Sequence, residues 1–340
     1  MKVFYSLLVV GAIIFSTGCK NDNTPSSIVT DIFVGGIEKN GGKYIAKYWK
    51  NGVPVILSDG TRDAVVLSVT ASGTDVYAAG YEVANSSLFF VAKYWKNGVP
   101  VILSDGTRDA AVTSIVVSGI DVYAAGNEQN GSYIHIAKYW KNGTAVTLTN
   151  GTYSANINSI VVNGPDVYAG GYEKNASNKI VAKYWKNGTA VTLTDGTRDA
   201  AIRSIVVIGN DVYAGGYEFN GVKYVAKYWK NSIPVILSNG TQDAAVMSMA
   251  VSGTDIYAAG YESLNTGLTV AKYWKNGTAV TLTDGTKTAQ INSTFINGTD
   301  IYLAGIDGYT SATYWKNGTP ISLPGGTQLS SVNSIFVYTH

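Results

Sequence analysis

The 340-residue sequence predicts an all-β fold, a seven-bladed β-propeller of four-stranded antiparallel blades. Tyrosine directly followed by tryptophan recurs seven times, and these pairs use every tryptophan in the chain. The intervals between successive pairs are 46, 45, 45, 44, 45 and 41 residues. A tandem unit of about 45 residues that holds four short strands is typical of a propeller blade. The seven tryptophans are Trp49, Trp95, Trp140, Trp185, Trp229, Trp274 and Trp315.

Four strand-like runs follow one another in each unit, as residues 114–118, 121–126, 136–141 and 145–149 illustrate. The runs are rich in valine, isoleucine, threonine and aromatic residues, and nothing between them has the length or periodicity of a helix. An Asn-Gly pair at 142–143 joins the third and fourth runs. Asn-Gly favours the type I′ turn of a β-hairpin because both residues tolerate positive φ. We therefore expect each unit to form an antiparallel meander.

The two ends of the repeat region predict a closed ring. The repeats begin with a second run, residues 31–35, and end after a first run, residues 334–338. Pairing of these two runs would complete the last four-stranded blade and bring the total to 28 strands. It would also remove the open sheet edge that invites association between chains. We therefore expect a monomeric propeller closed by strands from both termini.

Residues 1–18 have the pattern of a signal peptide. A basic residue, Lys2, precedes an apolar run over residues 3–15 that is too short to cross a bilayer. Small residues then lead to Cys19, the single cysteine, in a pattern that resembles the lipobox of bacterial lipoproteins. An ordinary secretory signal followed by a chance cysteine is the alternative. The resemblance implies a lipid on Cys19, a tether over residues 19–27 and a propeller over residues 28–340.

A lipid on Cys19 would make the membrane a partner of the protein. We therefore expect an exported chain that is anchored through its N-terminal lipid to the bacterial cell envelope, in the outer membrane. Lys20-Asn21-Asp22 resembles the short charged signal that sends some Gram-negative lipoproteins to the cell surface. A surface-facing and a periplasm-facing position both stay open at this point.

The composition excludes several function classes. Charged residues make up 14% of the chain and the net charge is +2, without any run of lysine or arginine, so we expect no nucleic-acid partner. His135 and His340 are the only histidines, and the chain has no nucleophile elbow and no phosphate-binding loop. We expect no catalytic residue, no metal and no cofactor, although carboxylate-only catalysis of the glycosidase type stays open.

Two recurring features are interpreted as structural. Tyr48-Trp49 and its copies could form an aromatic platform for sugars, but a position that is occupied in every unit indicates packing between blades. Glu82 and Lys93 recur in equivalent form in six units, and both change together in the last unit, to Asp307 and Thr313. We expect a cross-strand ion pair, because an enzyme needs one catalytic pair and not six.

Candidate binding residues lie where the units differ. The distance from each tryptophan to the acidic residue that ends the second run of the following unit is always 33 residues, as from Trp49 to Glu82. The units therefore differ in length only between their second and third runs. The connection from a fourth run to the next first run, such as residues 59–64, should lie on the same rim and surround the channel mouth. Solvated turn residues are the alternative interpretation. The ligand-binding candidates in these connections are Arg62, Asp63, Arg108, Asp109, Tyr153, Arg198, Asp199, Gln242 and Lys287.

Two glycines precede an aromatic residue after some second runs, at 170–171 and 215–216, and this resembles kelch propellers. Four of the seven units have Ala-Gly there instead. The whole chain is similar to the tandem-repeat propeller lipoproteins of bacterial envelopes, which implies an architecture but no reaction. The lipobox, the one-sided loop variation and the missing catalytic set favour a binding scaffold for a glycan, a peptide or a protein partner. A carbohydrate-active hydrolase or lyase and a structural envelope protein are the alternatives.

Overall fold

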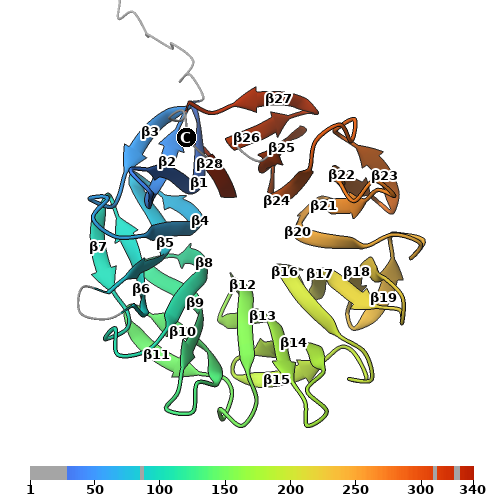
Figure 1. The fold of residues 1–340 in the computed structure, drawn as a ribbon, viewed down its shortest axis with the longest axis horizontal. Coiled ribbons are helices and arrows are strands. Elements are labelled where there is room, and N and C mark those ends of the chain that lie inside the picture. The colour runs from blue at the N-terminus through green and yellow to red at the C-terminus, as the bar shows by residue number, and fades with distance from the viewer. Residues whose placement is uncertain (1–28, 85–87, 309–311, 325–329) are drawn as a thin grey trace, which may run out of the picture.

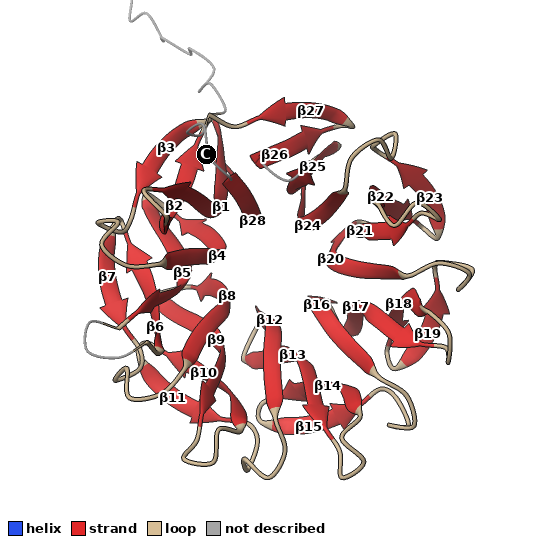
Figure 2. Cartoon of the chain, viewed as in Figure 1, coloured by secondary structure: helices blue, strands red, loops and turns tan. Residues whose placement is uncertain are grey.

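A computed structural model describes residues 29–84, 88–308, 312–324 and 330–340. Every regular element in these ranges is a β-strand, and the strands form seven four-stranded sheets (Figure 2). The all-β fold and the number of blades are therefore confirmed. The expected signal peptide, Cys19 and the tether lie outside the described residues.

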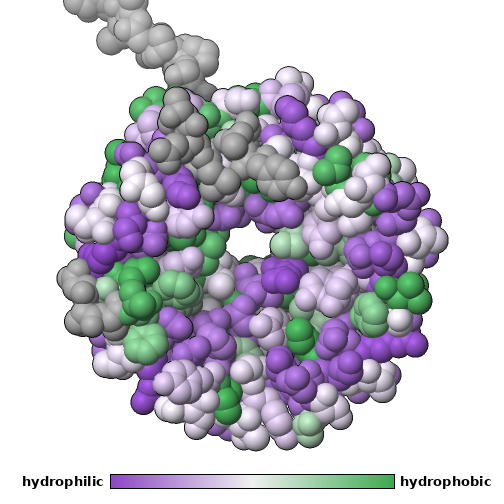
Figure 3. Space-filling model, viewed as in Figure 1, coloured by the Kyte–Doolittle hydropathy of each residue, from purple (hydrophilic) through white to green (hydrophobic). Residues whose placement is uncertain are grey.

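The seven sheets are arranged as blades around a central axis (Figure 1), along which the space-filling view shows an open channel (Figure 3). Blade 1 consists of β28 (Ser330–Thr339), β1 (Thr30–Asn40), β2 (Lys43–Lys50) and β3 (Val53–Ile56). Blade 2 consists of β4 (Ala64–Ser72), β5 (Asp75–Val83), β6 (Phe90–Lys96) and β7 (Val99–Ile102). Blade 3 consists of β8 (Ala110–Ser118), β9 (Asp121–Gln129), β10 (His135–Lys141) and β11 (Thr144–Thr147). Blades 4 and 5 consist of β12 (Ala155–Asn163), β13 (Asp166–Lys174), β14 (Ile180–Lys186) and β15 (Thr189–Thr192); and β16 (Ala200–Ile208), β17 (Asp211–Phe219), β18 (Tyr224–Lys230) and β19 (Ile233–Ile236). Blades 6 and 7 consist of β20 (Ala244–Ser252), β21 (Asp255–Ser263), β22 (Thr269–Lys275) and β23 (Thr278–Thr281); and β24 (Ala289–Asn297), β25 (Asp300–Asp307), β26 (Ala312–Lys316) and β27 (Thr319–Ser322).

Blade 1 closes the ring with strands from both ends of the described chain. β28 pairs with β1 from Thr30 opposite Thr339 to Glu38 opposite Ser330. β1 pairs in turn with β2, so the last strand in sequence becomes the channel-facing strand of the first blade (Figure 1). The predicted closure is confirmed.

The hairpin between the third and fourth strands of each blade is a type I′ turn, as the Asn-Gly pairs predict. The φ angles are +51° at Asn51 and +81° at Gly52. The Asn51 side chain accepts a hydrogen bond from the amide of Ile32 at 2.8 Å and donates one to Asp31 at 2.7 Å. The same two bonds recur in the other six blades. Asparagine therefore both tolerates the turn and ties the outer hairpin to the second strand.

The tryptophans form the packing between blades. All seven are at most 2% exposed. Trp140 of blade 3 shares a hydrophobic cluster with Tyr77 and Tyr94 of blade 2, and Trp229 of blade 5 does the same with Tyr184 of blade 4. A fully buried indole between neighbouring blades leaves no aromatic face for a sugar. The packing interpretation of the Tyr-Trp pairs is confirmed.

The recurring glutamate and lysine form cross-strand ion pairs in six blades, as expected. Glu173 and Lys183 in blade 4 lie 2.6 Å apart, and the side chains of Glu82 and Lys93 in blade 2 are each 8% exposed. Each lysine follows the alanine that begins the Ala-Lys-Tyr-Trp segment, so its position is fixed by the buried strand. The pairs belong to the scaffold, because the same arrangement occurs in six places.

A β-bulge interrupts the channel-facing strand at the same point in every blade, and the serine after it joins neighbouring blades. In blade 5 the register shifts between Ile202 and Ser204. The Ser204 hydroxyl accepts a hydrogen bond from the amide of Met249 in blade 6 at 3.0 Å. Equivalent bonds link every blade to the next and form a closed ring. The serines are Ser68, Ser114, Ser159, Ser204, Ser248, Ser293 and Ser334.

Candidate functional site

One face of the ring carries both the loops between second and third strands and the connections between blades. We call it the loop face. Asp109, in the connection that precedes blade 3, accepts a hydrogen bond at 2.8 Å from the amide of Phe90, which begins the third strand of blade 2. Asp199 holds Ile180 in the same way at 2.8 Å. The prediction that these two kinds of segment share a rim is confirmed.

The aspartates predicted to bind ligand each anchor a neighbouring blade. Asp63 accepts a hydrogen bond from the amide of Tyr44 at 2.8 Å, and its other oxygen lies 3.8 Å from the Lys43 amine. Together with Asp109 and Asp199, it fixes the start of the third strand of the preceding blade, next to the loop of variable length. These carboxylates therefore shape the loop face by holding backbone, each through one of its two oxygens.

The three predicted arginines contact backbone or carboxylate on the same face. Arg62 lies 3.1 Å from Glu82 and donates to the carbonyl of Val83 at 2.8 Å. Arg198 donates to the carbonyl of Asn220 at 2.6 Å. The guanidinium of Arg108 is exposed and lies beside the backbone of Gly131.

The remaining three candidates lie in different blades and different surroundings. Tyr153 is 39% exposed and lines a cavity of about 350 Å³ together with Glu173 and Lys183. Lys287 lines a separate cavity of about 330 Å³, and Gln242 donates a hydrogen bond to Asn265. The nine candidates thus surround the loop face and do not converge on one cavity.

The channel itself is lined by one residue from the bulge of each blade. These seven side chains surround a cavity of about 220 Å³. Figure 3 shows the opening at the centre of the ring, with hydrophilic and hydrophobic residues on its edge. Unlike the surrounding strand, the bulge position differs in chemistry between blades. Its residues are Leu67, Thr113, Asn158, Arg203, Met247, Asn292 and Asn333.

Sequence reasoning missed the bulge residues, although a signal was present. Each first run reads x-Val/Ile-x-Ser, with a constant apolar residue and a constant serine around one position that changes from blade to blade. A position between two invariant neighbours that varies in charge and size is one that packing does not dictate. A β-bulge changes the direction of the side chains in a strand, and the sequence pattern does not reveal where the bulge lies. The sequence therefore did not show that these side chains point into the channel.

Four of the channel side chains bind the backbone of the next blade. Asn158 donates to the carbonyl of Ile202 at 2.6 Å, and Thr113 donates to the carbonyl of Ile157 at the same distance. Asn292 and Asn333 make the corresponding bonds at 2.7 Å each. These side chains therefore stiffen the ring and present their remaining polar atoms around the channel.

Arg203 in blade 5 behaves differently from the other channel residues. Its Nε is buried and has no hydrogen-bond partner among the described residues. Its guanidinium lies 5.5 Å from the ring centre of Tyr217 on the neighbouring strand. Tyr172 and Tyr261 occupy the equivalent positions in blades 4 and 6. Burial raises the pKa of both phenols, and the positive charge of Arg203 acts in the opposite direction on each pKa.

A polar relay leads from blade 3 to the channel. The ring of His135 lies 3.2 Å from the side-chain oxygen of Asn127, whose amide donates to Asn156 at 2.5 Å. Asn156 donates in turn to Asn158 at 2.8 Å. Burial lowers the pKa of His135, and the nearby charge of Asp109 raises it to a smaller extent. The relay joins two blades through neutral side chains.

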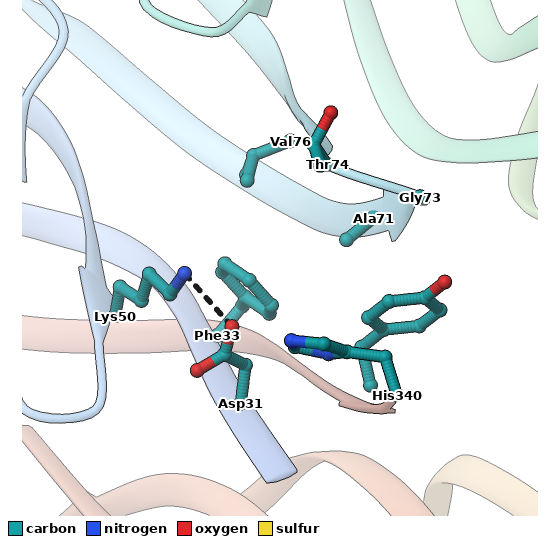
Figure 4. A pocket seen from close by; sticks show the side chains of 9 residues that line it. Asp31, Phe33, Lys50, Ala71, Gly73, Thr74, Val76 and His340 are labelled. Carbon is teal, nitrogen blue, oxygen red and sulfur yellow. Dashed lines mark ion pairs between the residues drawn. The ribbon is translucent and has the colours of Figure 1, made fainter. Parts of the chain in front are cut away.

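The opposite face has a cavity of about 280 Å³ between blades 1 and 2 (Figure 4). Asp31 and Lys50 form an ion pair of 2.8 Å on one side of it. Tyr338 and His340 stack with their ring centres 5.3 Å apart on the other. The same ion pair recurs in every blade, so the stacked rings are the feature that distinguishes this cavity from the equivalent positions in other blades.

Within the ranges that the structure describes, no group of three or more histidine, cysteine, aspartate or glutamate side chains is placed to hold a metal ion. In the same part of the chain, no helix is long and apolar enough to cross a membrane.

Comparison with known proteins supports the architecture. No protein-family model and no curated protein matches the chain. A solved structure, a puromycin-hydrolyzing peptidase of Mycobacterium tuberculosis, superposes with a TM-score of 0.57 at 11% sequence identity. The match covers 86% of this chain and 53% of the peptidase, so the chain spans about half the length of that protein. At this identity the likeness shows the fold alone: the chain is similar to a propeller.

Proposed function

We propose that the chain is a cell-envelope lipoprotein whose propeller is a binding scaffold for a glycan, a peptide or a protein partner, recognised on the loop face and in the channel mouth. One observation carries the proposal. Residues that build the blades repeat around the ring, whereas the channel-lining bulge residues and the loops of one face differ from blade to blade. A rigid frame whose loops vary in length on one face only, and whose channel lining varies in chemistry, is the arrangement of a recognition module.

The anchored aspartates give this face its rigidity. Asp109 holds the start of β6 and Asp199 holds the start of β14, so each variable loop is fixed at one end by the neighbouring blade. A loop held in this way loses less conformational entropy when a ligand binds. This supports a preformed binding surface over one that folds around its partner.

The experiment is a thermal-shift screen of the chain against oligosaccharides, peptidoglycan fragments and peptides. A ligand at 100 times its Kd should stabilise the fold by about 2.7 kcal/mol. Asp109→Ala, which releases the β6 loop without touching the channel, should weaken binding, while Asp166→Asn on the opposite face serves as its control. Turnover of a polysaccharide by the purified protein would overturn the proposal in favour of an enzyme. Binding that no loop-face variant alters would place the ligand elsewhere.

The anchoring part of the proposal rests on the lipobox-like sequence before Cys19. The kelch-like glycine pairs at 170–171 and 215–216 support a propeller but add nothing on the ligand. We propose that the chain is exported and held in the outer membrane by its lipid. Metabolic labelling with a fatty acid should mark the protein, and Cys19→Ser should abolish both the label and the membrane fraction. A labelled Cys19→Ser protein, or an unlabelled native one, would contradict the proposal.

A further inference from the structure

We propose that Arg203 is the anchor of an anion-binding site in the central channel, and that this site takes the carboxylate of an acidic sugar at the end of a glycan. The inference rests on the proposed function and deepens it, since it names a ligand class and the residue that selects it.

The charge of Arg203 is the first step. Of the seven bulge residues that line the channel cavity, only Arg203 is charged. In the described part of the chain its Nε has no hydrogen-bond partner, and no carboxylate forms an ion pair with it. The Nε of Arg62 is also without a partner, but the guanidinium of Arg62 has a counter-charge because it pairs with Glu82. A cation that faces a cavity without a counter-charge attracts an anion, and a guanidinium binds a carboxylate through two parallel hydrogen bonds.

The surroundings of Arg203 hold the guanidinium in place. The guanidinium carbon of Arg203 lies 5.5 Å from the ring centre of Tyr217, within the range of a cation–π contact. Tyr217 is fixed in turn by an edge-to-face contact with Tyr224, at 5.0 Å between ring centres. A cation–π contact restrains the arginine side chain and uses none of the N–H groups that bind a carboxylate. The site is therefore organised before the ligand arrives.

The neighbouring residues favour a sugar as the body of the ligand. Tyr172, Tyr217 and Tyr261 hold equivalent positions in three consecutive blades, and the charge of Arg203 acts on the phenols of Tyr172 and Tyr261 in addition to its contact with Tyr217. Asn158 in the bulge of the preceding blade donates one amide hydrogen to the carbonyl of Ile202, which leaves its second amide hydrogen for a sugar hydroxyl. The combination offers a charge for a carboxylate, and nearby amide and phenol groups for the hydroxyls of a sugar.

The shape of the channel argues against a peptide. Peptides commonly bind by adding a strand to an open sheet edge. In every blade the channel-facing strand is interrupted by its bulge, as between Ile202 and Ser204, which breaks the ladder that such a peptide would extend. The cavity of about 220 Å³ is also smaller than the roughly 300–1,000 Å³ of a drug-sized site. It suits the terminal unit of a ligand.

The test is calorimetry on the full chain in detergent, with oligosaccharides of galacturonate, glucuronate and mannuronate as probes. Their methyl esters, which have the same rings without the charge, are the matched ligands. Arg203→Met places in blade 5 the residue that blade 6 has at this point, Met247, so the scaffold accommodates it. We expect at least one acid to bind, its ester to bind at least tenfold more weakly, and Arg203→Met to weaken the acid by about 10- to 100-fold. Arg203→Lys should fall between, because it keeps the charge and loses the bidentate geometry.

Controls separate this inference from the proposed function. Lys186→Met removes a cation of the opposite face that pairs with Asp166, and it should leave uronate binding unchanged. If none of the acids binds, or if Arg203→Met binds them as the native chain does, the inference is wrong. It is also wrong if a peptide with a free C-terminal carboxylate depends on Arg203 and the sugars do not. Binding of a neutral glycan or a protein that ignores Arg203 would overturn this inference and leave the proposed function standing.

Discussion

The buried ion pair of blade 2 should respond unequally to the loss of either partner. Glu82 and Lys93 are each 8% exposed, and Glu82 has a second partner in Arg62 at 3.1 Å. Removal of the carboxylate by Glu82→Gln leaves two cations without their counter-charge. Removal of the amine by Lys93→Met leaves Glu82 paired with Arg62. The glutamate variant should therefore be the more destabilised of the two.

The magnitudes follow from what stays buried. Loss of one partner of a buried pair costs about 3–5 kcal/mol when the other charge is left uncompensated, so we expect about 3 kcal/mol for Glu82→Gln. For Lys93→Met we expect about 1–2 kcal/mol, because a charged hydrogen bond is lost but Arg62 compensates Glu82. The double variant should lose less stability than the two single variants together, because without Lys93 the loss of Glu82 no longer leaves that lysine uncompensated. Blade 7 has Asp307 and Thr313 at these positions, so the scaffold accommodates an acidic residue there without the lysine.

Blade 4 supplies the control. Glu173 and Lys183 form the same pair at 2.6 Å, but the residue equivalent to Arg62 is Tyr153. Glu173→Gln and Lys183→Met should therefore have similar costs. Urea unfolding followed by tryptophan fluorescence gives the midpoint of each variant, and an unchanged slope validates the comparison. Equal losses from the two blade 2 variants, or the same inequality in blade 4, would refute the role assigned to Arg62.

Three further predictions follow, one on the turns and two on the response to pH. Ser232 replaces the usual glycine of the type I′ turn at φ +70°, so Ser232→Gly should stabilise the fold by about 0.5–1 kcal/mol and Gly277→Ser should destabilise it similarly, as urea midpoints would show. Burial lowers the pKa of His135 below 6.5, so His135 takes up a proton at higher pH in the unfolded chain than in the folded protein. The melting temperature should therefore fall as pH drops below about 6.5. His135→Gln should remove this fall, and a fall that persists in the variant would contradict the assignment to His135. Hydrogen bonds from lysine and asparagine lower the pKa of the second-strand aspartates below 3.8. Their contribution to the stability of the fold is therefore fully present above about pH 4 and is lost as pH falls further. A steep decline in melting temperature between pH 4 and 2 would show this loss. These aspartates are Asp31, Asp75, Asp121, Asp166, Asp211, Asp255 and Asp300.

The sequence was sufficient for the fold because the determinants of the fold repeat. Seven tryptophans, seven asparagine turns and the offset between the two termini each have one structural solution, a closed ring of meanders. The candidate site was harder to predict, because hydrogen bonds to backbone leave no periodic signal. Nothing in the residue pattern distinguishes Asp63 as an acceptor for the amide of Tyr44 from a solvated turn aspartate. The Arg203 side chain points into the channel because of a β-bulge. A bulge is a property of the register between two strands, which the sequence pattern does not show.

A ligand that binds in a ring needs a departure from symmetry to take one orientation. The scaffold supplies almost none, since the serine bonds, the asparagine turns and the ion pairs with the second-strand aspartates are the same in every blade. The departures lie at the channel, where Leu67 and Met247 are apolar, three bulges carry an amide and Arg203 alone carries a charge. Because Arg203 is also the channel residue whose Nε has no partner in the described chain, the strongest departure from symmetry coincides with the strongest unmet interaction. Recognition that begins at Arg203 would orient a ligand, and the unequal neighbours around the ring would then select among ligands of the same charge.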